Sequence, residues 1–170
     1  MLLLEGLEQA VARGARPLAR ILAWGGAFDS SASRVGWGVG HAALGSALSG
    51  FMRRVGMVPA DVDLVVSGAS GALAGDRLEA LMLRAAWGGV GLPTVLAPKA
   101  TTGEYGGGFL GAAVLAARSG PFAATPGFRE LDPELDVVPY SGEPVPAPRC
   151  VLVTSLAAGG AAAFLLLERP

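Results

Sequence analysis

Three segments of the sequence combine polar side chains with glycine, and each directly follows an apolar run. They are residues 67–79 (SGASGALAGDRLE), 99–104 (KATTGE) and 155–160 (SLAAGG). Loops at the carboxyl ends of parallel strands are where α/β proteins gather ligands. Glycine lets the backbone of such a loop approach a substrate or another chain closely. The carboxylates, the ammonium group and the hydroxyls in these segments could therefore move protons or stabilise developing charge.

The elements expected to position these loops alternate between strand and helix, which is typical of parallel strands crossed by helices. Apolar periodicity predicts helices at residues 39–55, 75–86 and 109–117, and a short one that begins near residue 7. Apolar runs predict strands at residues 16–24, 64–66 and 93–97, and the tail of another at residues 1–5. We expect the glycines at 25 and 26 to end the first of these strands.

The connecting segments are rich in small residues or in proline. We expect a mobile polar loop at residues 29–34 and a small-residue loop at residues 99–108. The proline-rich residues 121–148 are expected to be irregular, with one strand near 135–138. From Cys150 to Leu167, eighteen residues carry no charge, which is long enough to span a membrane. The Gly159-Gly160 pair divides this stretch into two runs of strand length, so we expect a buried antiparallel hairpin and no membrane span.

Composition favours one compact domain that covers residues 1–170 and that either buries much of its apolar surface or hides it against a partner. The net charge is −1, 52% of the residues are hydrophobic and 16% are charged, so no basic surface for nucleic acid is expected. Cys150 is the only cysteine, which excludes an internal disulfide, and the N-terminus lacks a secretory signal. A reducing, cytoplasmic setting is expected. No nucleotide-binding or metal-binding pattern is present, so we expect neither a cofactor nor a metal.

The order and spacing of the three segments resemble the C-terminal half of β-ketoacyl synthases. In that family, strand ends carry a His-Gly-Thr-Gly-Thr loop followed by a spaced Asp and Glu, a Lys-x-x-x-Gly-His loop, and a Ser-Phe-Gly-Phe-Gly-Gly turn. Residues 2–15 (LLLEGLEQAVARGA) look like the strand and helix that open this half, so the resemblance covers nearly the whole chain. It implies an α/β fold, namely a thiolase-like half-domain whose mixed five-stranded sheet is covered by helices.

The resemblance identifies both retained and replaced positions. The motif scaffold comprises Ser70, which replaces a threonine, and the retained positions Gly71, Asp76, Glu79, Lys99, Gly103, Ser155, Gly159 and Gly160. The two catalytic histidines of the family fall at Gly68 and Glu104. Its threonines fall at Ser70 and Ala72, its gating phenylalanine at Ala158 and its asparagine at Ala162.

These replacements remove the groups that decarboxylative condensation needs. The reaction places negative charge on a thioester oxygen, which two imidazole donors can stabilise. Gly68 has no side chain, and the carboxylate of Glu104 would repel the enolate unless burial protonates it. The only histidine, His41, lies in the helix expected at 39–55, and Cys150 lacks a helix N-terminus that would lower its pKa. We expect that the chain does not catalyse condensation alone.

A retained scaffold without histidines is similar to the chain-length factors of bacterial aromatic polyketide systems. Those are catalytically silent ketosynthase homologues that pair with an active ketosynthase. Residues 76–80 (DRLEA) and 98–103 (PKATTG) look like their motifs. The resemblance implies a non-catalytic subunit in polyketide or fatty-acid-like biosynthesis, in a dimer or hetero-oligomer. Its partner would be a ketosynthase N-terminal half, or a full ketosynthase subunit, that carries the nucleophilic cysteine, with acyl carrier protein as a further partner.

Two alternative functions stay open at this point. One is a split but active synthase, in which Lys99 and Glu104 take part in catalysis and Glu104 acts as a general base. The other is a homodimer that imitates the two halves of the fold and binds acyl chains or carrier protein. Single residues also have simpler interpretations. Lys99 could tie its loop to Glu79 or Glu104, and Asp76 and Glu79 could serve only to start a helix.

Overall fold

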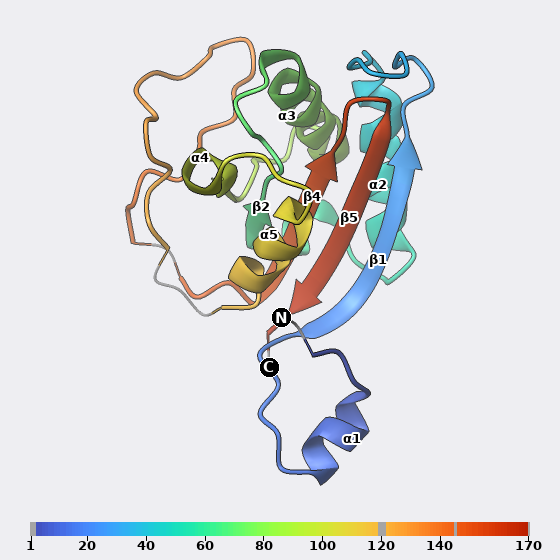
Figure 1. Ribbon diagram of the computed structural model, residues 1–170, viewed down its shortest axis with the longest axis vertical. Coiled ribbons are helices and arrows are strands. Elements are labelled where there is room, and N and C mark those ends of the chain that lie inside the picture. The colour runs from blue at the N-terminus through green and yellow to red at the C-terminus, as the bar shows by residue number, and fades with distance from the viewer. Residues whose placement is uncertain (1–2, 119–121, 145, 170) are drawn as a thin grey trace.

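The computed structural model describes residues 3–118, 122–144 and 146–169, and it shows a five-stranded sheet with helices on both faces (Figure 1). The strands are β1 (Arg20–Phe28), β2 (Leu64–Val66), β3 (Thr94–Leu96), β4 (Cys150–Leu156) and β5 (Ala161–Glu168). Their order across the sheet is β1-β5-β4-β2-β3. Strand β2 runs parallel to β3 and β4, whereas β5 is antiparallel to β1 and β4. The expected mixed five-stranded sheet is confirmed.

Helices cover both faces of this sheet, except for the N-terminal helix, which lies apart from it. They are α1 (Leu7–Ala12), α2 (His41–Arg53), α3 (Leu73–Trp87), α4 (Lys99–Thr102) and α5 (Gly108–Ala116), with a short 3-10 turn, η1 (Pro59–Asp61). Helices α2 and α3 pack together behind the sheet in Figure 1, and α5 lies in front of β2 and β4. Gly45 permits the close approach of α2 and α3, because a Cβ there would stand 2.6 Å from the Cβ of Ala85.

The centre of the sheet is buried on both faces. Val65 and Leu152 belong to the core cluster beneath α2 and α3, whereas Val66 and Val153 belong to the cluster beneath α5. A strand that is covered on both faces needs apolar residues at successive positions and not only at alternate ones. This explains why residues 64–66 and 150–153 read as unbroken apolar runs.

The front face of β1 is left open. Trp24 is 82% exposed and Phe28 is 66% exposed. Trp24 pairs with Leu165 of β5, so it lies on the same face of the sheet as the core cluster beneath α5, but that helix covers β2 and β4 rather than β1 (Figure 1). Leu110 and Val114 of α5 are exposed as well. We call the surface formed by Trp24 and Phe28 on β1 the open apolar face.

Strand β1 begins and ends later than predicted, at Arg20 and Phe28 instead of residues 16 and 24. The glycines at 25 and 26 do not end it, and the strand continues to Phe28 because β5 pairs with it along this length. Gly26 is needed within the strand, since a Cβ there would stand 2.7 Å from the carbonyl oxygen of Ala162. Residues 3–5 form no strand, and residues 1–2 of that prediction lie outside the described residues.

Two other predictions are wrong in detail. The expected loop after β3 begins with the short helix α4. The strand expected near residues 135–138 is absent. Asp136 instead turns the chain with a φ of 48°, and a single parallel bridge joins Val95 to Pro139. The C-terminal hairpin is confirmed, and among the described residues no helix has the length and apolarity that crossing a bilayer requires.

Candidate functional site

Glu79 ties together the elements that carry the first loop. It lies on α3 and is 3% exposed. Its Oε1 accepts hydrogen bonds from the backbone N–H of Gly68 (3.0 Å) and from Thr154 Oγ1 (2.5 Å), and its Oε2 accepts one from Ser67 Oγ (2.9 Å). Burial raises the pKa of Glu79 above its ordinary value, and these hydrogen bonds offset only part of that rise. Glu79 therefore fixes the ends of β2 and β4 on α3 rather than merely starting a helix.

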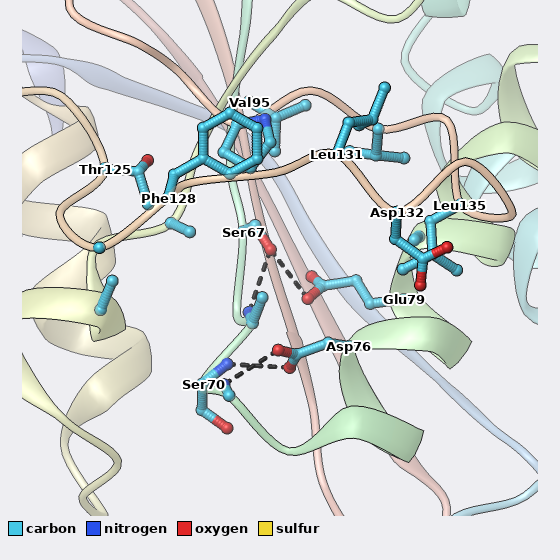
Figure 2. Close-up of a pocket in the computed structure, with 18 of the residues that line it drawn as sticks. Ser67, Ser70, Asp76, Glu79, Val95, Thr125, Phe128, Leu131, Asp132 and Leu135 are labelled. Carbon is cyan, nitrogen blue, oxygen red and sulfur yellow. Dashed lines mark hydrogen bonds between the residues drawn. The ribbon is translucent and has the colours of Figure 1, made fainter.

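Asp76 shapes the same loop from the first turn of α3. Its carboxylate accepts hydrogen bonds from the backbone N–H groups of Ser70 and Gly71, both at 2.9 Å, as Figure 2 shows for Ser70. Gly71 has a φ of 90°, a conformation that residues with a side chain rarely adopt. The Asp and the Gly that match the family motif thus hold one tight turn.

Gly68 lies where the resemblance places a catalytic histidine, and the backbone closes around it. A Cβ at this position would stand 2.8 Å from the Cα of Ser155 and 3.0 Å from the carbonyl oxygen of Thr154. Backbone atoms cannot swing aside as the end of a flexible side chain can. The present arrangement of β2 and β4 therefore leaves no space for an imidazole at position 68.

Lys99 and Glu104 form an ion pair at the second loop. Lys99 Nζ lies 2.7 Å from Glu104 Oε2, and the side chain of Lys99 is 4% exposed whereas that of Glu104 is 57% exposed. Gly103 turns the chain between them with a φ of 70°. Gly108 leaves room for the lysine, because a Cβ there would stand 3.1 Å from Lys99 Cε. Of the two carboxylates considered as partners for Lys99, the structure selects Glu104.

The third segment is a tight hairpin that packs against the loop after β1. Gly159 and Gly160 have φ values of 90° and 95°. A Cβ on Gly160 would stand 2.5 Å from the carbonyl oxygen of Asp29, and the Asp29 N–H donates to the Gly160 carbonyl at 2.8 Å. Ser155 ends up beside Gly68, as described above. The two glycines thus serve the contact between this hairpin and its neighbouring loop.

Asp29 is a site residue that the sequence analysis missed. It is 3% exposed, and its carboxylate accepts hydrogen bonds from Ser31 Oγ (2.6 Å), Ser31 N–H (2.9 Å) and Gly40 N–H (3.0 Å). The Ser31 hydroxyl, and after it the two N–H groups, hold the pKa of Asp29 below its ordinary value despite its burial. Asp29 therefore fastens the loop that was expected to be mobile. The Asp-Ser pair directly after a strand was the available signal, since Asp often bonds the backbone two residues on.

The remaining candidate positions lie in the scaffold. Cys150 is buried at the start of β4, and burial raises the pKa of its thiol to about 12, which suits a structural residue. Ala158 is exposed in the hairpin turn, whereas Ala162 is buried in the core. His41 begins α2. Among the residues described, no group of three acidic, His or Cys side chains is placed to hold a metal ion.

A cavity of about 390 Å³ adjoins the first loop, at the carboxyl ends of β2 and β3 (Figure 2). Ser67, Ser70, Asp76 and Glu79 line one side of it, and residues from the segment 125–139 line the other. Gly68, Lys99, Glu104 and Ser155 are not among its lining residues. The Lys99–Glu104 pair thus lies outside this cavity, whereas Glu79 both lines the cavity and holds the closed ends of β2 and β4.

The curated proteins that match this chain belong to the family that its motifs resemble. No family model matches the chain. The 3-oxoacyl-[acyl-carrier-protein] synthase 2 of Mycobacterium bovis and that of Mycobacterium tuberculosis are 35% identical over 157 residues, a match that covers 86% of this chain. The match spans only 36% of the length of these curated relatives.

Solved structures with a similar fold are ketosynthases as well. The ishigamide ketosynthase/chain length factor is 25% identical, with a TM-score of 0.84 over 96% of this chain and 41% of that one. A type II polyketide ketosynthase, solved with its acyl-carrier protein and a bound hexaketide, is 14% identical, with a TM-score of 0.88 over 98% of this chain and 42% of that one. By sequence and by fold, the chain is thus a relative of the β-ketoacyl synthases and has the thiolase-like fold of a ketosynthase half-domain.

Proposed function

We propose that the chain acts as a non-catalytic, chain-length-factor-like part of a β-ketoacyl synthase assembly, beside a ketosynthase subunit that carries the nucleophilic cysteine. One observation carries the proposal. The backbone of residues 154 and 155 occupies the space that any side chain at position 68 would need. A position that was open but held glycine could regain a histidine easily, whereas this one is packed shut.

The second histidine position supports the same conclusion. A carboxylate that is ion-paired with an ammonium group has no hydrogen to donate to an oxyanion. Glu104 is held in this way by Lys99. With Gly68 closed and Glu104 paired, neither position supplies the donors that would stabilise the enolate oxygen during decarboxylation.

The names of two similar structures support an assembly with a ketosynthase and acyl carrier protein. One similar structure is a ketosynthase/chain length factor, and another is a ketosynthase solved with its acyl-carrier protein. The open apolar face also favours association, because large apolar surfaces on a soluble chain mark contact sites. We further propose that acyl carrier protein is a second partner of the assembly. Its product would be a polyketide or a fatty-acid-like chain, and its setting would be cytoplasmic.

A split but active synthase is the second candidate function. It is favoured by the burial of Lys99 against a carboxylate at a family histidine position, and by curated relatives that are named as synthases. In that case Lys99 and Glu104 would contribute to turnover in the assembly. Neutralising the pair separates the two candidates, because only the active synthase requires it.

Co-purification tests the association itself. The tagged chain is co-expressed with a ketosynthase from its gene neighbourhood, and the complex is sized by light scattering. We expect a stable complex that Trp24→Ser weakens, since Trp24 lies on the open apolar face, while Leu18→Ser, at a site that is 70% exposed elsewhere, leaves it intact. A stable monomer that never retains the ketosynthase would contradict the proposal. A homodimer that excludes the ketosynthase would favour a binding module for acyl chains or carrier protein instead.

A further inference from the structure

The cavity beside the first loop is built mainly from apolar side chains. Leu83, Val95, Phe128, Leu131, Leu135 and Val137 line it, and Figure 2 shows Phe128 and Leu131 on the segment that closes it. Its volume, about 390 Å³, lies within the range of small-molecule sites in proteins. We call the segment of residues 125–139 that covers this cavity the roof.

The roof is held in place by contacts outside the cavity. Arg77 of α3 pairs with Glu134 at 2.5 Å, and Arg84 pairs with Asp136 at 2.7 Å. Beyond the last roof residue, the N–H of Tyr140 donates to the carbonyl of Val95 at 2.7 Å. The roof is thus fastened to α3 and to β3, so the cavity exists before any ligand arrives.

The ionisable side chains that line the cavity are all acidic. Four acidic side chains line it: Asp76, Glu79, Glu130 and Asp132. No lysine, arginine or histidine is among the lining residues, and the two arginines that hold the roof are occupied by their ion pairs. An anionic ligand would therefore meet like charges without a compensating cation.

One polar atom of the lining lacks a partner. Thr125 Oγ1 is buried and makes no hydrogen bond to any of the described residues. A buried hydroxyl without a partner destabilises a fold, so such an atom calls for a water or ligand group. Asp76 and Glu79 of α3, on the other side of the cavity, offer further acceptor oxygens.

From these features we propose that the cavity is a binding site for an apolar small molecule that ends in a hydroxyl or an amine, and that it rejects carboxylates and phosphates. The apolar walls take the body of the molecule, and Thr125 with the acidic side takes the polar end. The site is separate from the Lys99–Glu104 pair, so the inference does not depend on the function proposed above.

A matched set of probes tests this site on the intact chain. Phenylpropanol, phenylpropylamine and phenylpropanoate share one apolar body and differ only in the polar end. In NMR titrations of the labelled protein, we expect the alcohol and the amine to shift the amide signals of Ser70, Gly71 and Thr125 in a saturable manner. We expect the carboxylate to bind at least about tenfold more weakly, because it meets uncompensated like charge.

Two substitutions sharpen the test. Ala100→Leu adds bulk at an exposed lining residue, and we expect it to weaken the alcohol about tenfold or more, since a few displaced methylene contacts are worth that much. Ala43→Leu makes the same change on the exposed side of α2 and should leave the affinity unchanged. Equal affinity for all three probes, no saturable binding to the folded protein, or an Ala100→Leu variant that binds like the wild type would each overturn the inference.

Discussion

Gly68 and Ser155 touch through their backbones, so that a single added methyl group at position 68 would stand 2.8 Å from the Cα of Ser155. Gly68 follows the end of β2, and Ser155 lies next to the last residue of β4, its parallel neighbour in the sheet. This arrangement leaves room only for glycine at position 68, where the resemblance to the synthase family places a catalytic histidine.

The first prediction concerns this contact. Gly68→Ala forces the ends of β2 and β4 apart, and we expect it to lower the free energy of unfolding by roughly 1–3 kcal/mol, the usual effect of overpacking. Urea denaturation measures the change. Gly50→Ala is the control, because the new methyl group in α2 would meet only the end of the Arg53 side chain, at 3.6 Å. That change should raise stability by about 0.5–1 kcal/mol, since alanine favours a helix over glycine. If Gly68→Ala left the free energy of unfolding unchanged, the ends of β2 and β4 would not be packed as closely as described.

The second prediction concerns the pH dependence that Glu79 contributes. Burial raises its pKa in the folded state above the ordinary value of 4.5, so the folded protein binds this proton more tightly than the unfolded chain does. The stabilising contribution of the protonated group is complete below pH 4.5 and is lost as the pH rises through the folded pKa.

Glu79→Gln, which cannot titrate, isolates this contribution. We expect the stability of the wild type relative to Glu79→Gln to fall as the pH rises from about 4.5 towards neutrality, as measured by urea denaturation across that range. Glu143→Gln removes an exposed carboxyl and serves as the control. A difference between wild type and Glu79→Gln that does not vary with pH would contradict the assigned direction.

The third prediction uses the unequal burial of the Lys99–Glu104 pair. Lys99→Met keeps most of the buried side chain and leaves a carboxylate that water already reaches, so stability should change by less than about 1 kcal/mol. Glu104→Gln leaves a buried ammonium group without its carboxylate and should be more destabilising, by roughly 1–3 kcal/mol. Thermal unfolding of both variants checks the order. The reverse order would mean that Glu104, not Lys99, is the buried partner.

The fourth prediction concerns Asp29. Its pKa is lowered in the folded state, so its contribution to stability is complete above its ordinary value of 3.8 and is lost as the pH falls through the folded pKa. Asp29→Ala should remove this acid dependence and lower stability at neutral pH by roughly 1–3 kcal/mol, because Ser31 and Gly40 lose their acceptor. Hydrogen exchange should also speed up at Gly40. Unaltered exchange there would show that Asp29 does not fasten the loop.

The sequence predicts well those features that depend on neighbours along the chain. The helices around residues 41–53 and 73–87, the apolar strands and the final hairpin follow from periodicity and turn residues. The roles of Asp76 and Gly71 also depend on a few successive residues. Both residues match the family motif, and the hydrogen bond between them holds the turn that the motif forms.

The features that were missed depend on contacts between distant segments. The closure of Gly68 requires β2 and β4 to be adjacent, which residue types at 68 and 155 do not indicate. Strand β1 passes through two glycines because β5 pairs with it. The choice of Glu104 over Glu79 as the partner of Lys99 depends on helix α4, where a loop was expected. The cavity depends on a roof held by ion pairs that are far apart in sequence, such as Arg77–Glu134.

In the proposed function, the Lys99–Glu104 pair and the closed strand ends take no part in chemistry. Malonyl-thioester decarboxylation tests this, measured on a complex of this chain with the ketosynthase that we propose as its partner and using the double variant Lys99→Met with Glu104→Gln. Light scattering first establishes that the variant complex is intact. We expect the turnover per ketosynthase to equal that of the wild-type complex. A fall of about a hundredfold or more, the usual effect of losing a group that stabilises the transition state, would contradict it.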